Sequence, residues 1–112
     1  MNGIELIAAE RQRQIEAEGW TAAHDDCHRH NELAIAAACY ALPPQARDCY
    51  IFDDPADFAV PAKKIHLPKI WPFEDCWWKP SDRIRELVKA GAMIAAEIDR
   101  LQRCSPTSNH GA

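Results

Sequence analysis

A short polar segment near the N-terminus concentrates side chains that could bind a metal ion or an anion. It runs His24-Asp25-Asp26-Cys27-His28-Arg29-His30. Histidine, cysteine and carboxylate are the ligands that zinc and other transition metals prefer. However, the spacing matches no closed zinc pattern, and the alternative is that the acids cap a turn while the histidines face water. We therefore assign no metal ligands, and the candidate ligand-binding residues from this part of the chain are Trp20, His24, Asp25, Asp26, His28 and Arg29.

A second cluster lies around residues 70–83, which hold three of the four tryptophans. Aromatic faces stack on nucleobases with about 1–3 kcal/mol per base. The helix start at 79–83 offers free backbone amides to an anion, and Lys79 and Arg83 add positive charge. Trp77, Trp78, Lys79 and Arg83 are therefore the remaining candidate ligand-binding residues.

These aromatic residues also have a purely structural interpretation. Large aromatic side chains complete the core of a small helical domain, where buried apolar area is scarce. Trp71, Phe73, Trp77 and Trp78 could fill one end of the core in this way. Both interpretations hold together if one ring face stays open.

Carboxylates are the third candidate set. Magnesium sites in helical bundles need acids that converge from facing helices. By helical angle, Glu86 and Glu97 lie at the flank of an apolar stripe, which predicts ordinary surface charges. The sequence identifies no cofactor, and a divalent metal stays open as an alternative with these candidate acids: Asp25, Asp26, Glu32, Glu86 and Glu97.

Three helices are expected to position these residues. Residues 2–18 form an amphipathic segment with Asn2 as N-cap and Gly19 as C-cap. An alanine-rich helix over 31–42 ends before Pro43-Pro44. A helix over 82–103 has apolar residues at intervals of three and four, namely Ile84, Leu87, Val88, Gly91, Ile94, Ala95, Ile98 and Leu101.

The predicted fold class is all-α, with a three-helix core (2–18, 31–42 and 82–103) and a long irregular insertion over about 45–70. Residues 1–104 are expected to form one helical domain, followed by a flexible tail over 105–112. A chain of 112 residues has room for one core.

Charge and composition restrict the partners. The net charge is −4 and the isoelectric point about 5.7, which disfavours binding to extended nucleic acid. No apolar run is long enough for a membrane span, and no signal peptide is evident, so the expected location is the cytoplasm of the host cell. Five cysteines without paired spacing are expected to be reduced thiols.

Several blocks of sequence resemble a family of small phage and prophage proteins. They are Glu10-Arg11-Gln12-Arg13-Gln14-Ile15 with Glu18-Gly19-Trp20-Thr21 and His24-Asp25-Asp26, then Trp77-Trp78-Lys79-Pro80, then Leu87-Val88-Lys89-Ala90-Gly91-Ala92. The chain departs from the family at His30-Asn31, where an Asp-Gly pair is usual. The resemblance implies a phage-borne accessory protein without a defined activity.

Two shorter likenesses concern function. Gly19-Trp20-Thr21, Asp25-Asp26, Arg29-His30 and Asp82-Arg83 are similar to the ryanodine-receptor repeat domain, whose bacterial and phage versions are suspected nucleotide-ligand binders. Size and helical character resemble the all-α MazG-type NTP pyrophosphohydrolases, but their paired Glu-x-x-Glu and Glu-x-x-Asp motifs are missing here.

The leading hypothesis is a non-catalytic protein that binds a small nucleotide-like or phosphorylated ligand between residues 24–30 and 71–83 and sequesters a host defence signal. A divergent metal-dependent nucleotide pyrophosphohydrolase and a protein-binding inhibitor of a host factor are the alternatives. A homo-oligomer is the expected assembly.

Overall fold

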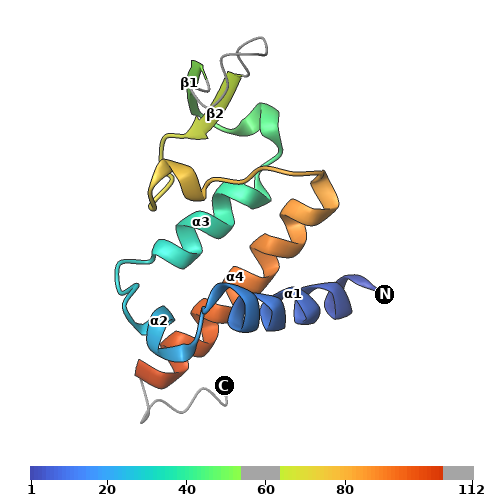
Figure 1. Cartoon of the computed structure of the whole chain (residues 1–112), viewed down its shortest axis with the longest axis vertical. Helices are drawn as coiled ribbons and strands as arrows, with labels where there is room; N and C mark the ends of the chain where they lie inside the picture. The colour runs from blue at the N-terminus through green and yellow to red at the C-terminus, as the bar shows by residue number, and fades with distance from the viewer. Residues whose placement is uncertain (54–63, 105–112) are drawn as a thin grey trace.

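The computed structural model describes residues 1–53 and 64–104, and this part of the chain is mainly helical (Figure 1). The α-helices are α1 (Gly3–Glu18), α2 (Ala22–Asp26), α3 (Glu32–Ala41) and α4 (Arg83–Cys104). Two short 3-10 helices, η1 (Pro44–Ala46) and η2 (Asp75–Trp77), and two strands, β1 (Cys49–Asp53) and β2 (Lys64–Pro68), complete it. The predicted tail over 105–112 lies outside the described residues. The three long helices are confirmed to within a residue or two of their predicted ends.

Two parts of the predicted fold are wrong. The prediction of a purely α-helical fold fails because β1 and β2 pair as an antiparallel sheet, with Ile51 opposite His66. These strands lie in the segment expected to be irregular, of which residues 54–63 are outside the described range. The polar connector after Trp20 also contains α2, whose N-cap Thr21 accepts a hydrogen bond from the His24 N–H at 3.4 Å. Each of these elements is only five residues long, too short for a periodic pattern to show.

Local signals define both ends of α1. The Asn2 side chain accepts the Glu5 N–H at 2.9 Å while the Glu5 carboxylate accepts the Asn2 N–H at 2.9 Å, which is a capping box. Gly19 adopts the left-handed conformation at φ 71°, and the Trp20 N–H then donates to the Gln14 carbonyl at 3.0 Å. The turn at Gly19 directs the chain into α2 and places Trp20 beside His24.

Helix α4 is the scaffold against which α1, α2 and α3 all pack (Figure 1). Ala92 and Ala96 are fully buried there, and such small side chains allow close approach of neighbouring helices. Gly91 lies under Ile7 of α1, since a Cβ atom at residue 91 would stand 2.5 Å from the Ile7 Cδ1 atom. The main core then combines α3 with the aromatic residues of the 65–78 region.

Glu86 and Glu97 are buried, with 2% and 6% exposure, so the expectation that they are surface charges is wrong. Their burial is tolerated because each carboxylate has a guanidinium partner. Glu97 binds Arg100, and Glu86 accepts hydrogen bonds from Arg47 at 3.0 Å and Arg83 at 3.4 Å.

Arg47 and Arg83 also complete the C-terminal end of α3. Arg47 Nε donates to the Cys39 carbonyl at 2.8 Å, and Arg83 Nη1 donates to the Tyr40 carbonyl at 3.0 Å and the Leu42 carbonyl at 2.9 Å. These contacts satisfy carbonyl groups that have no partner within the helix. Arg83, proposed above as a ligand-binding residue, therefore has a structural role at this junction.

Among the described residues, no helix is long and apolar enough to cross a membrane.

Candidate functional site

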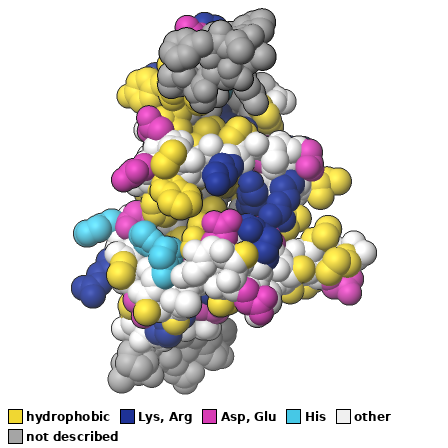
Figure 2. Space-filling model, in the orientation of Figure 1, with side chains coloured by type: hydrophobic (Ala, Val, Ile, Leu, Met, Phe, Trp, Pro, Cys, Tyr) yellow, Lys and Arg dark blue, Asp and Glu magenta, His cyan; other side chains and the backbone are white. Residues whose placement is uncertain are grey.

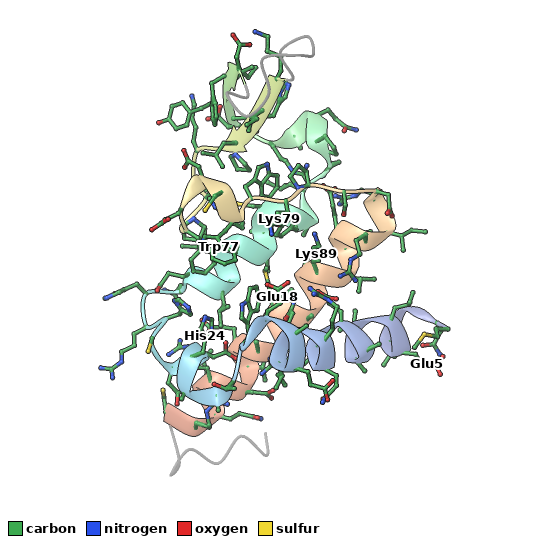
Figure 3. The ribbon with its side chains drawn as sticks, in the orientation of Figure 1. Glu5, Glu18, His24, Trp77, Lys79 and Lys89 are labelled. Carbon is green, nitrogen blue, oxygen red and sulfur yellow. The ribbon has the colours of Figure 1, made fainter. Side chains whose placement is uncertain are left out.

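A cavity of about 290 Å³ lies where α1, α2, α3, α4 and the η2 region meet. Figure 3 shows His24 and Glu18 on one side of it, Trp77 and Lys79 on the opposite side, and Lys89 projecting from α4. Its lining combines apolar, aromatic, cationic and acidic side chains, a composition typical of small-molecule sites. The lining residues are Glu10, Arg13, Gln14, Glu18, Trp20, His24, His28, Leu33, Tyr40, Trp71, Phe73, Trp77, Lys79, Lys89 and Met93.

Aromatic rings form one continuous wall of this cavity. Trp20 stacks on His24 with ring centroids 5.8 Å apart and an interplanar angle of 7°. His28 meets His24 at 4.9 Å and Phe73 at 5.1 Å, both edge to face. The contacts continue through Trp71 to Tyr40, so rings from α2, α3 and the segments that connect the helices support one another. This wall offers apolar faces and ring edges to a flat ligand.

Two lysines supply positive charge to the cavity. Lys89 Nζ donates to the Lys79 carbonyl at 2.9 Å and lies 5.3 Å from the centre of the Tyr40 ring, and Lys79 Nζ lies 5.7 Å from the centre of the Trp77 ring. Neither ammonium group has a carboxylate within 4.0 Å among the described residues. Burial, helped by the charge of Arg85, lowers the pKa of Lys89, so an anion beside it would be favourable.

The space-filling view shows how these groups are distributed. In Figure 2, basic side chains gather beside an apolar area in the middle of the visible face, and histidines lie on the other side of that area. The arrangement follows from the fold, because the lysines come from α4 and the segment before it whereas the histidines come from α2 and the turn after it. An apolar surface between a cationic and a histidine-lined edge suits a ligand with a flat centre and a charged end.

The α1 side of the cavity is polar. Glu10 is 2% exposed, and its carboxylate is 2.7 Å from both Arg13 and Arg85. Burial works to raise the pKa of Glu10, but the hydrogen bonds from the two arginines outweigh it and lower the pKa. Arg13 also binds Glu18 at 3.0 Å. The acids here are thus neutralised by arginines, whereas no carboxylate of the described residues neutralises the two lysines on the opposite side of the cavity.

Gln14 carries the least satisfied polar group of the site. Its side chain is fully buried, and its Nε2 group donates to Glu10 Oε2 at 3.1 Å. Exchanging the amide O and N atoms would place two acceptors face to face, so this hydrogen bond fixes the orientation of the amide. The Oε1 atom then has no hydrogen-bond partner among the described residues. A buried acceptor without a donor is costly, and a ligand N–H or O–H group would satisfy it.

The two histidines of the wall are held by acids. His24 Nδ1 is 3.1 Å from Asp25 and His28 Nδ1 is 3.2 Å from Glu32. Burial works to raise the pKa of Glu32, but the His30 N–H and the His28 ring outweigh it and lower the pKa. The carboxylates orient both imidazole rings through Nδ1, and no hydrogen bond to either Nε2 atom is made by the part of the chain that the structure describes.

Half of the ten candidate residues come together in the cavity. Trp20, His24, His28, Trp77 and Lys79 line it. Trp77 is 51% exposed, so about half of its surface is accessible. Aromatic and cationic candidates from both sequence clusters therefore line one cavity.

The other five candidates lie elsewhere. Trp78 is buried, stacks on Tyr40 at 4.7 Å and donates its ring N–H to the His66 carbonyl, which is the structural interpretation of that residue. Asp25 is fully buried against Arg11, and Asp26 binds Arg103 at 2.7 Å. Arg29 is exposed and Arg83 holds the end of α3, so neither lines the cavity.

Sequence reasoning missed the contribution of α1 and α4 to this site. Gln14 and Glu10 are four residues apart and therefore on one helix face, the only local signal they give. Lys89 and Met93 of α4 are likewise four residues apart, on the side of that helix away from most of its isoleucines. Only the packing of α1 on α4 shows that these two faces meet.

The acids proposed for a metal site are separated and paired. Asp25, Asp26, Glu86 and Glu97 each bind an arginine, and Glu32 binds His28. In residues 1–53 and 64–104, no three His, Cys, Asp or Glu side chains are grouped so that they could hold a metal ion.

Nothing matches the chain in comparisons with protein-family models, with curated proteins and with solved structures.

Proposed function

We propose that this cavity binds a small anionic ligand with a flat heteroaromatic part, of the nucleotide class. The observation that carries the proposal is the position of Lys79 and Lys89, which have no carboxylate partner in residues 1–53 and 64–104, beside a wall of aromatic rings. The phosphate would meet Lys79 and Lys89, and the base would lie against the Trp20, His24 and Trp77 region. A cavity of about 290 Å³ is near the lower end of the range for small-molecule sites, which favours a ligand about as large as a mononucleotide.

Gln14 would favour ligands that present a hydrogen-bond donor on the bound edge. Its buried Oε1 atom requires a hydrogen-bond donor, and the exocyclic amino or ring N–H groups of nucleobases are such donors. A site whose acceptor is left unpaired discriminates strongly against ligands without the matching donor. We therefore expect bases with an amino group on the bound edge to bind best.

In biological terms, we propose that the protein is a phage or prophage accessory protein that sequesters a nucleotide-derived host defence signal. Binding without turnover is consistent with the pairing of its acids with arginines. The resemblance to small phage proteins supports the phage origin, and the shorter one to ryanodine-receptor repeat domains supports binding of a nucleotide-like ligand.

Isothermal titration calorimetry with nucleoside monophosphates, cyclic mononucleotides and cyclic dinucleotides tests the proposal. Lys79→Gln and Lys89→Gln should each weaken binding by about 10- to 100-fold, since each removes a charge-assisted hydrogen bond of ~1.5–3 kcal/mol. Lys64→Gln is the matched control, because Lys64 lies on β2 in an exposed ion pair with Asp53 and should leave affinity unchanged. A folded protein that binds none of these nucleotides, or equal affinity in all three variants, would refute the proposal.

Gln14→Met separates recognition from folding. The change removes a buried acceptor that has no partner among the described residues, while Glu10 keeps both arginines, so the melting temperature should stay the same or rise. Affinity for a nucleotide with an amino group should nevertheless fall by about 10-fold or more. Unchanged affinity would show that Gln14 does not contact the ligand.

A further inference from the structure

Helix α4 carries a row of large apolar side chains that the rest of the described chain leaves about half exposed or more, and only Gly91 at its middle lies under Ile7 of α1. The row continues along the whole helix at intervals of three and four residues, with Gly91 at its middle. Its members are between 46% and 68% exposed, and they are Ile84, Leu87, Ile94, Ile98 and Leu101. The sequence predicts this amphipathic pattern, but the structure places the core on the other sides of the helix.

The row and the cavity lie on opposite sides of α4. With 3.6 residues per turn, Lys89 and Met93 face away from the midline of the row. Lys89 and Met93 line the cavity, whereas Ile94 and Ile98 face outward. A partner on the exposed row would therefore leave the cavity accessible.

The spacing of the row matches the apolar positions at which two helices pack together in a coiled coil. Positions 84, 87, 91, 94, 98 and 101 follow the alternation of three and four that defines the a and d positions of a heptad repeat. No charged residue interrupts it over the 22 residues of α4. Such a seam is self-complementary, because the same apolar row can face itself across a two-fold axis.

The exposed area also fits a dimer. Monomeric proteins rarely expose a continuous apolar patch larger than a few hundred Å². Two rows of five half-exposed isoleucine and leucine side chains, buried against each other, would remove on the order of 1,000 Å² from water, the size at which specific interfaces begin. Ile7, which lies over Gly91, would extend the contact onto α1.

We propose that α4 pairs with α4 of a second copy of this chain in a two-fold symmetric dimer that leaves both cavities open. This inference does not depend on the proposed ligand, and its test needs no ligand.

Sedimentation velocity of the full chain at micromolar concentration tests the dimer. The wild type should sediment with twice the 12.6 kDa mass of one chain. Ile94→Glu combined with Ile98→Glu should sediment as a monomer with an unchanged helical circular dichroism spectrum. Ile51→Glu is the matched control, because Ile51 on β1 is 61% exposed and lies outside the row, and this variant should stay dimeric.

A milder variant covers the case in which the double glutamate protein does not fold. Ile98→Ala keeps the surface uncharged and should raise the dimer dissociation constant by about tenfold. A wild type that stays monomeric up to about 100 μM, or a dissociation constant that neither Ile98→Ala nor the double variant changes, would overturn the proposal, because such a result means that the row meets something other than a second copy.

Discussion

The close crossing of α1 over α4 makes a specific prediction about Gly91. A Cβ atom at residue 91 would lie 2.5 Å from Ile7 Cδ1 and 2.8 Å from Ile7 Cγ1, both well inside van der Waals contact. Gly91→Ala gains about 0.5–1 kcal/mol because alanine is the better helix former. Overpacking costs about 1–3 kcal/mol, part of which Ile7 can relieve by rotating its side chain. We expect Gly91→Ala to lower the free energy of unfolding by about 0.5–2 kcal/mol.

The sign of this effect should reverse when Ile7 is shortened. Alanine at residue 7 lacks the Cγ1 and Cδ1 atoms that meet the new methyl group. In an Ile7→Ala background, Gly91→Ala should therefore stabilise the protein by about 0.5–1 kcal/mol. The two changes are then coupled by about 1–3 kcal/mol, much more than independent sites show.

The wild type, the two single variants and the double variant form a double-mutant cycle. Urea denaturation followed by circular dichroism, at one protein concentration for all four proteins, measures their free energies of unfolding. Gly3→Ala is the matched control, because a Cβ atom at this glycine of α1 meets nothing within 4 Å. It should change stability by less than about 0.5 kcal/mol. Equal destabilisation by Gly91→Ala in both backgrounds would refute the described crossing.

Three further predictions concern buried groups. Burial raises the pKa of Cys39 to about 11, so iodoacetamide at pH 8 should label the exposed Cys27 and leave Cys39 unlabelled until urea is added. Peptide mass spectrometry measures the labelling, and label on Cys39 before Cys27 would contradict the prediction. Glu86→Gln should cost about 3–5 kcal/mol in urea titrations because it leaves the buried charge of Arg47 unpaired, and a loss below 1 kcal/mol would contradict the pairing. Glu10 has a pKa below its usual 4.5, so its contribution is present above that value and is lost as pH falls through the lowered pKa. Glu10→Gln should therefore cost about 1.5–3 kcal/mol at pH 7 and less as the pH falls below 4.5, whereas a pH-independent cost would disprove the shift.

Features of the fold that depend on local chemistry could be predicted from the sequence. Asn2 and Gly19 mark the ends of α1 because capping involves residues three to six positions apart. The proline pair at 43–44 ends α3 for a similarly local reason. The period of α4 predicts its length to within a residue at each end.

Features that depend on the pairing of distant segments could not be predicted. The strands of the hairpin are five residues each, and the register that pairs Tyr50 with Leu67 is a tertiary property. The period of α4 predicts an apolar row, but it does not say that Ala92 and Ala96 would meet the other helices while Ile94 stays exposed.

The candidate site shows the same division. Aromatic and cationic types near Trp77 and Lys79 indicate a ligand with a flat part and negative charge, and these residues do meet His24 across one cavity. Gln14 could not be identified, because a glutamine on a helix with many polar residues is usually a surface residue. Its proposed role follows only from its burial beside Glu10.

The way in which α3 ends has a consequence for the cooperativity of folding. Its last carbonyl groups are satisfied by Arg47 and by Arg83, and Arg83 follows Tyr40 by 43 residues along the chain. A peptide of residues 31–42 would lack both guanidinium groups, and a helix of that length is marginal in water. Helix α3 should therefore exist only when α4 has docked, and the backbone amides around Ala36 and Ala37 should exchange with deuterium only through opening of the whole domain.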